Sequence, residues 1–310
     1  MLPATAVSLA ALAVALAWPV PAALARARWP RRDPLVALVC WQAIGLAGGL
    51  SIIGALLVHG LAPWGNSLPE AGWSLLTGQP AADPVRGDHW VALTLAAVLA
   101  FELLGVLALS WVRTARTRRR HRALLELVVQ PSAAIPDTRL LDHPAPVAFC
   151  IPGAHPLLVL SSGIVAELDE AQLAAVVAHE RAHLREHHHL LLLPFVAWEA
   201  ALPVLPAAAR AHAAVRELVE MRADDVALTS LPGPGARRTL AHAIVAAAGG
   251  IGGAGVPDGA LAVTGSPTGA RVVRLLQPAQ QLPSSARWAA LLSAGLLLLL
   301  PTALLVLPAL

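Results

Sequence analysis

Residues 167–184, "ELDEAQLAAVVAHERAHL", set the interpretation of this chain. Asp169 is a suitable helix cap, and Gln172 follows three residues later, which is a capping-box pattern. The apolar side chains that come next repeat at the spacing of one buried helical face: Leu173, Val176 and Val177. The stretch therefore predicts a helix that begins near Asp169, buries one face and carries the segment His-Glu-Arg-Ala-His at residues 179–183.

This segment has the spacing of a metal site. His179 and His183 are four residues apart, so both imidazoles lie on one helix face and can bind a single ion. Two neutral nitrogen ligands leave a zinc ion its full charge, which acidifies water and polarises a carbonyl group. Glu180 lies beside such an ion and is the predicted catalytic base.

The third ligand has three candidates. His189 stands ten residues after His179, as in metzincins, but that geometry needs a helix-breaking glycine where this chain has Glu186, so the helix is expected to continue. Asp258 resembles the Asp-Gly of intramembrane site-2 proteases, yet it lies in a glycine-rich stretch and not in an apolar span.

The third candidate is Glu220, which Asp224 follows one helical turn later. This arrangement after HExxH resembles gluzincins, and the resemblance implies that Glu220 binds zinc while Asp224 supports a zinc-binding histidine. Glu217 and Asp225 are the fallback residues for these two roles. The resemblance favours Zn²⁺ bound by His179, His183 and Glu220.

Two short strands are predicted before the zinc helix. "PVAFCIPGAHPLLVLSSG", residues 146–163, contains two apolar runs that a Pro/Gly turn separates. An extended peptide can bind to a strand edge by main-chain pairing. The second strand is therefore predicted to bind substrate, through Leu157, Val159 and Ser161.

The composition indicates an integral membrane protein, because 57% of the 310 residues are hydrophobic and only 13% are charged. Four stretches are long and apolar enough to cross a bilayer: 2–24, 35–61, 90–112 and 288–310. Arginine is concentrated at residues 26–32 and 113–122, whereas the loop 62–89 contains only Arg86. The positive-inside rule then places both arginine-rich segments in the cytoplasm of a multi-pass cell-membrane protein.

The predicted fold is thus an α-helical membrane protein with about four transmembrane helices and a cytoplasmic α+β zinc protease domain of gluzincin type. Residues 1–112 form three N-terminal spans, 113–287 the protease domain and 288–310 the last span. The apolar stretch 190–209 separates the two halves of the zinc site. Three prolines interrupt it, so it is predicted to be a membrane-dipping hairpin that packs against the protease core and does not cross.

Taken together, the three N-terminal spans, the strand pair ending in "LSSG", HExxH, E-x-x-A-D and a last span resemble the BlaR/MecR-type antirepressor metalloproteases. No extracellular penicillin-binding sensor is expected in this chain. The resemblance implies a zinc metalloendopeptidase that faces the cytoplasm and cleaves a cytoplasmic or membrane-proximal protein, such as a transcriptional repressor in a signalling pathway. The expected partners are this protein or peptide substrate and the lipid bilayer, and nothing suggests nucleic-acid binding.

Two alternatives stay open at this point. The CAAX prenyl proteases and the heat-shock membrane proteases also share HExxH and a downstream glutamate, which would make the chain a membrane quality-control peptidase. A zinc-binding membrane sensor that does not cleave is the other alternative.

Overall fold

The computed structural model describes residues 2–132, 135–153, 156–201, 206–251, 267–277 and 281–306. The chain divides into two compact units. Unit 1 consists of Met1–Ser110, Leu193–Val215 and Leu282–Leu310, and unit 2 consists of Trp111–Leu192 and Arg216–Gln281. Asp258, one of the ligand candidates, lies outside the described residues.

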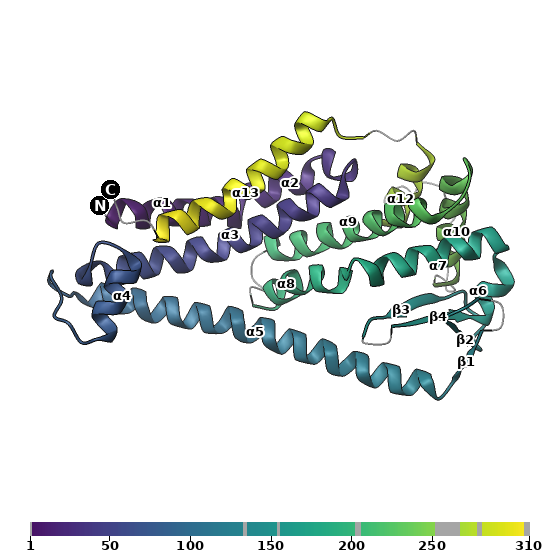
Figure 1. Ribbon diagram of the computed structural model, residues 1–310, viewed down its shortest axis with the longest axis horizontal. Helices are drawn as coiled ribbons and strands as arrows, with labels where there is room; N and C mark the ends of the chain where they lie inside the picture. Colours follow the sequence, from purple (N-terminus) through teal and green to yellow (C-terminus); the bar gives the residue numbers. More distant parts are fainter. Residues whose placement is uncertain are drawn as a thin grey trace. The chain divides into compact units, whose positions relative to one another are not determined.

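The described part of unit 1 is helical. Its elements are α1 (Leu2–Ala17), α2 (Pro19–Arg26), η1 (Trp29–Arg31), α3 (Pro34–Leu61), η2 (Ala62–Trp64), α4 (Leu68–Leu76), the first part of α5 (Gly87–Glu126), parts of α8 (His188–Ala201) and α9 (Pro206–Ser230), and α13 (Ser284–Val306). Figure 1 shows α1 and α13 lying along α3. Small side chains permit this packing, since a Cβ atom at Gly54 of α3 would lie 2.7 Å from Leu305 of α13.

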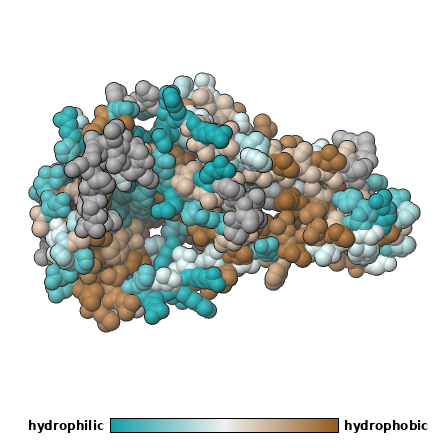
Figure 2. Space-filling view, turned by 180° about the vertical axis from the view of Figure 1, so that it is seen from behind, coloured by the Kyte–Doolittle hydropathy of each residue, from teal (hydrophilic) through white to brown (hydrophobic). Residues whose placement is uncertain are grey.

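Four described helical segments are long and apolar enough to span a membrane: Ala4–Arg26, Pro34–Trp64, Gly87–Glu126 and Ser284–Val306. They contain most of the four stretches predicted from the sequence. Large apolar side chains on α13 are exposed at helical spacing, among them Trp288, Leu292, Leu296 and Leu299. Figure 2 shows such apolar side chains gathered over the long helices of unit 1. These features fit helices whose outer faces contact lipid.

The arginine-rich segment 113–122 is part of helix α5. Arginine has a high helix propensity, and no proline or glycine interrupts the chain between Gly105 and Pro131. The helix therefore continues to Glu126, beyond the predicted end of the span at residue 112.

The stretch 190–209 belongs to α8 and α9, with residues 202–205 outside the description. Within unit 1, Phe195 of α8 packs edge-on against Trp41 of α3, with ring centroids 6.4 Å apart. Gly45 of α3 leaves room for Trp198, whose ring would lie 3.4 Å from a Cβ atom at that position. Residues 193–215 are therefore grouped with the apolar helices of unit 1, whereas the sequence-based boundaries had included them in the segment 113–287.

Unit 2 contains a four-stranded sheet with the order β1-β2-β4-β3. The strands are β1 (Val129–Pro131), β2 (Thr138–Leu141), β3 (Ala148–Ile151) and β4 (Leu157–Ser161). The predicted pair β3 and β4 is antiparallel, with Cys150 opposite Leu158. The sequence did not reveal β1 and β2, and β2 pairs in parallel with the other side of β4. Strand β4 is thus internal, and β3 is an edge strand of the described sheet.

The remaining elements of unit 2 include α6 (Ser162–Glu167), α7 (Glu170–Arg185), α10 (Ala236–Ile251) and α12 (Pro267–Leu276). The predicted capping box is confirmed, since Asp169 accepts a hydrogen bond from the Gln172 amide and the Gln172 side chain accepts one from the Asp169 amide. The predicted buried face is also confirmed: Leu173, Val176 and Val177 pack against Leu158 and Leu160 of β4.

The prediction that this helix continues beyond Glu186 was wrong. Helix α7 ends at Arg185, and His187 adopts a left-handed backbone conformation with φ of 51°. A new helix, α8, then begins at His188. The carboxylate of Glu186 bonds to Arg222 and His188, so tertiary contacts outweigh the helix propensity of this residue.

Candidate metal centre

Small side chains bring the two halves of the site together. Ala182 of α7 and Ala223 and Val226 of α9 form one buried cluster. Because these alanines project little from their helices, α7 and α9 approach closely at the level of His179 and His183. Glu220, one turn before Ala223 on α9, then reaches both histidines.

The three predicted ligands converge. His179 Nε2 lies 3.1 Å from His183 Nε2 and 3.4 Å from Glu220 Oε2, while His183 Nε2 lies 3.6 Å from Glu220 Oε1. In a tetrahedral site with zinc bonds of ordinary length, neighbouring ligand atoms are about 3.3 Å apart. The donor set of two imidazoles and one carboxylate therefore fits a zinc ion in both chemistry and spacing. The Glu220 side chain is 40% exposed, so the site is open on this side.

Asp224 occupies the position expected for a supporting residue. Its carboxylate is buried, and Oδ1 lies 2.9 Å from His179 Nδ1, the nitrogen that does not face His183. A carboxylate at this point fixes the orientation and tautomer of a metal-binding imidazole.

Arg271 of α12 also belongs to the site, and the sequence analysis missed it. Its guanidinium donates to both oxygens of Asp224, at 2.7 and 2.9 Å, and lies 3.0 Å from Glu220 Oε2. Arg274, one turn later, pairs with Asp225 at 2.7 Å. Two arginines three residues apart thus match two adjacent aspartates, which is the sequence signal that could have identified Arg271. The same pairing occupies Asp225, the fallback for Asp224.

Glu180 follows the predicted ligand His179 on α7 and contacts strand β3 of the sheet through Cys150. Burial raises the pKa of its carboxyl group. The thiol of Cys150, on the edge strand β3, is within hydrogen-bonding reach of this carboxylate. Burial also raises the pKa of Cys150, so the thiol keeps its proton and donates to Glu180.

The charges at the site are strongly coupled. Burial opposes ionisation of Glu220 and Asp224, but hydrogen bonds from His179 and Arg271 and the arginine charge outweigh it and lower each pKa to about 2. Burial also disfavours a charged His179, yet its bonds to Asp224 and Glu220 raise the pKa to about 9. His183 has no such carboxylate bond, and burial lowers its pKa to about 4.

A second chain of contacts orients His183. Its Nδ1 lies 2.9 Å from His188 Nδ1, and His188 Nε2 lies 3.2 Å from Glu186 Oε2. Arg222 Nε donates to the same Glu186 oxygen at 2.8 Å. His188 is 1% exposed. His188 therefore lies inside the protein although the neighbouring His187 is exposed, because the turn at His187 directs His188 inward.

The remaining candidates lie elsewhere. Glu217 is not part of the group of converging ligand atoms. Two further histidines are not at the site: His212 pairs with Glu199 within unit 1, and His242 is exposed on α10. His189, the metzincin-type ligand, is likewise absent from the converging group of described residues.

The predicted substrate strand needs correction. Leu157, Val159 and Ser161 lie on β4, which pairs with β2 on one side and β3 on the other, so β4 has no free edge within the described sheet. All five residues of β4 are buried. The Ser161 hydroxyl is fully used, since it accepts from the amides of Val147 and Ile164 and donates to the carbonyl of Ala145. A substrate strand can pair instead with the edge strand β3.

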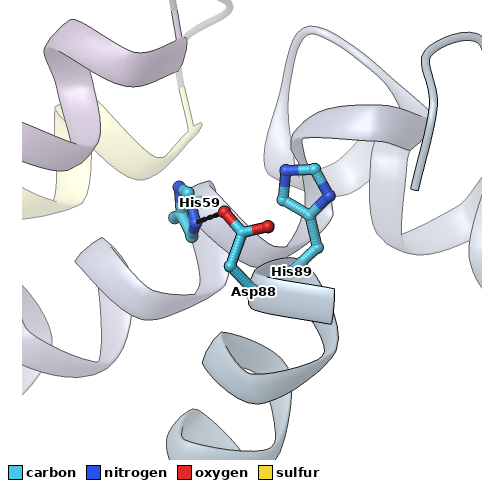
Figure 3. A group of neighbouring side chains, drawn as sticks. All are labelled: His59, Asp88 and His89. Carbon is cyan, nitrogen blue, oxygen red and sulfur yellow. Dashed lines mark ion pairs between the residues drawn. The ribbon is translucent and has the colours of Figure 1, made fainter. Parts of the chain in front are cut away.

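Another group of metal-ligand types lies in unit 1, where His59 at the end of α3 faces Asp88 and His89 at the start of α5 (Figure 3). His59 Nε2 is 3.3 Å from Asp88 Oδ2. Arg86 binds both oxygens of Asp88, and its amide donates to His89 Nδ1 at 3.1 Å. Because Arg86 already neutralises the carboxylate of Asp88, we assign no metal to this group.

Residues 114–216 match Peptidase family M48. The match contains the HExxH segment and the edge strand, and it covers about a third of the chain. It ends before Glu220, so the third ligand and its supporting residues rest on the geometry alone. Peptidase family M48 consists of metallopeptidases that typically depend on zinc, and the match therefore supports the metallopeptidase assignment. No solved structure matches the chain.

Proposed function

We propose that the protein is a membrane-embedded zinc metalloendopeptidase. The observation that carries this proposal is the convergence of His179, His183 and Glu220, whose ligand atoms are 3.1 to 3.6 Å apart, with the partly buried side chain of Glu180 next to His179 in the chain. The match of residues 114–216 to Peptidase family M48 supports the same conclusion.

The residues have separate tasks in peptide hydrolysis. His179, His183 and Glu220 hold the zinc ion, which when bound supplies a Lewis acid that acidifies water and polarises the substrate carbonyl. Glu180 accepts the proton of the attacking water and delivers it to the departing amine. Burial raises the pKa of this carboxyl group above its ordinary value, which strengthens it as a base. Asp224 holds His179 in place, and Arg271 holds Asp224 and Glu220.

The substrate is an extended peptide that pairs with β3. Main-chain pairing with an edge strand aligns a peptide without restricting its sequence. Cys150 on this strand contacts Glu180, so a peptide beside β3 passes the catalytic carboxylate. This arrangement assigns the alignment role to Ala148–Ile151 in place of Leu157, Val159 and Ser161.

The site faces the cytoplasm of a multi-pass cell-membrane protein in this proposal. The arginine-rich segments 26–32 and 113–122 support this orientation through the positive-inside rule. The resemblance to the BlaR/MecR type supports a cytoplasmic repressor as the substrate, with quality control of membrane proteins as the alternative. A reporter fused after Thr229 tests the orientation, because only a chain whose α9 end is cytoplasmic gives a cytoplasmic signal.

The decisive experiment compares purified wild type with Glu180→Gln, Glu220→Ala and Glu170→Gln. Glu180→Gln should keep stoichiometric zinc but lose peptide cleavage, and Glu220→Ala should lose zinc. Glu170 is exposed in the first turn of α7, so Glu170→Gln is a matched control that should retain both properties. Proteomics of cells that carry wild type or Glu180→Gln would then identify substrates. The protease assignment would be refuted if the wild-type protein binds zinc but produces the same fragments as Glu180→Gln, both in cells and in assays.

A further inference from the structure

Unit 2 contains a cavity of about 450 Å³ between the C-terminal part of α5 and the edge strand β3. Its wall is largely apolar, with Leu124 and Leu125 from α5 and Phe149 and Ile151 from β3. One charged side chain, Arg118 of α5, lines the same cavity. The cavity therefore combines an apolar wall with a fixed positive charge.

Arg118 has no counter-ion among the described residues. Of the five other partly buried arginines in the described part of unit 2, Arg237 donates to backbone carbonyls, and four pair with a carboxylate: Arg122 with Glu126, Arg222 with Glu186, Arg271 with Asp224 and Arg274 with Asp225. Arg118 is partly buried too, but its ionisable neighbours are Cys150, whose thiol stays protonated, and His189, whose pKa is lowered to about 4 by burial and by Arg118 itself. A partly desolvated guanidinium without a carboxylate can gain a bidentate ion pair from a ligand.

The cavity is next to the catalytic carboxylate. Cys150 lines it and also contacts Glu180, so one side chain separates the cavity from the proposed base. Side chains along β3 alternate between the two faces of the sheet. Phe149 and Ile151 belong to the cluster that includes Leu125 of α5, whereas Ala148 packs against the α7 side. A peptide paired with β3 would alternate in the same way and direct every second side chain toward Arg118.

We propose that this cavity is a substrate subsite for a carboxylate, and that Arg118 makes the protein prefer an acidic residue next to the scissile bond. The apolar wall holds the methylene groups of the acidic side chain, and the guanidinium binds its carboxylate. A chain-terminal carboxylate offers the same chemistry. This inference rests on the proposed peptidase function, since it names the class of substrate that the same site cleaves.

The experiment uses full-length protein in detergent and pairs of peptides that differ by Glu or Gln at one position near the cleaved bond, each with a free or amidated C-terminus. Wild type should cleave the Glu member with a kcat/KM about tenfold or more above that of the Gln member, the size expected for a charge-assisted pair. A Glu-over-Gln preference that persists on amidation assigns the carboxylate to the side chain. Equal cleavage of the Glu and Gln members, with a similar loss of rate when both are amidated, assigns it to the chain terminus.

Three variants complete the test. Arg118→Gln should remove the preference, and Arg118→Glu should reverse it toward a Lys-containing peptide. Arg119 is the next residue of α5 and is exposed. Arg119→Gln removes one positive charge, as Arg118→Gln does, and should leave the preference unchanged. Because each variant is judged by a ratio of two rates from one preparation, partial misfolding does not affect the result.

The outcomes separate this inference from the proposed function. Wild type that cleaves no peptide overturns the protease assignment. Wild type that cleaves Glu and Gln peptides equally and also cleaves free and amidated peptides equally, or that keeps its preference in Arg118→Gln, overturns only the subsite. If Arg118→Gln instead reduces binding to vesicles of anionic phospholipid and leaves the peptide ratio unchanged, Arg118 binds lipid phosphate and the subsite is also overturned.

Discussion

Arg271 and Asp224 form a two-pronged ion pair, with Arg271 Nη2 2.7 Å from Oδ1 and Nε 2.9 Å from Oδ2 of the aspartate. The pair joins α12 to α9 directly behind His179, which Asp224 also contacts. Arg271 reaches Glu220 as well, so one guanidinium holds both a proposed zinc ligand and the carboxylate that orients another. The metal centre thus depends on a helix that carries none of its ligands.

We predict that Arg271→Ala lowers zinc affinity about 10- to 100-fold, the usual effect of removing a group that supports metal ligands. Competition with a fluorescent zinc chelator measures this change. Arg271→Lys should recover only part of the affinity, because an ammonium group cannot bind Asp224 with two parallel hydrogen bonds.

Arg274→Ala provides the matched control, because Arg274 lies on the same helix and pairs with Asp225, away from the zinc ligands. It should leave the affinity nearly unchanged. Equal losses in Arg271→Ala and Arg274→Ala would mean that α12 acts only through general stability.

The histidine run gives a second prediction. His188 is buried against His183 Nδ1, whereas the neighbouring His187 is exposed. His188→Ala should therefore weaken zinc binding about tenfold or more through loss of the bond that orients His183, while His187→Ala should have little effect. Metal titration of both variants checks this. A larger loss from His187→Ala would contradict the inward position of His188.

Local patterns explain which parts of the fold were predictable. The capping box and the apolar stripe of α7 depend on residues within a few positions of each other, and the structure has both. The spacing of His179 and His183 fixes their shared face for the same reason. The apolar spans follow from composition over about 20 residues, which a sequence displays directly.

The features that were missed depend on distant contacts. The role of Arg271 arises from pairing with Asp224, 47 residues earlier, so its signal appears only when the arginines of α12 are compared with the distant aspartates of α9. Strand β2 is only four residues long, yet its insertion beside β4 moves the available edge to β3. The break at Glu186 results from its bond to Arg222, 36 residues later, which outweighs the helix propensity on which the prediction relied.

Gly163 gives a prediction about the support of the zinc helix. A Cβ atom there would lie 2.0 Å from the carbonyl oxygen of Pro144, a backbone atom that cannot move aside as a flexible side chain can. Gly163→Ala should therefore destabilise the fold by about 1 to 3 kcal/mol. Thermal unfolding followed by scanning fluorimetry measures the shift. Gly235→Ala is the control, because nothing lies within 4 Å of a Cβ atom at that position, and an equal shift would exclude the steric cause.

Zinc binding should release a proton from His179. In the metal-free protein, burial opposes the charged ring, but the hydrogen bonds to Asp224 and Glu220 raise its pKa to about 9. Zinc binds only the neutral imidazole, so below this pH the ion must displace a proton, and the apparent affinity should rise about tenfold per pH unit until it levels off. His183 and Glu220, with pKa values of about 4 and 2, have already lost their protons near neutral pH.

Calorimetric titration in buffers with different ionisation enthalpies measures the number of protons released on zinc binding. The titration is done near pH 6, because zinc-bound water ionises at about pH 7 and would add its own proton there. We expect close to one proton for wild type. Asp224→Asn removes the carboxylate that stabilises the charged ring, so His179 should then be largely neutral and the release well below one proton. No release by wild type, or the same release by Asp224→Asn, would show that His179 is not the group that zinc deprotonates.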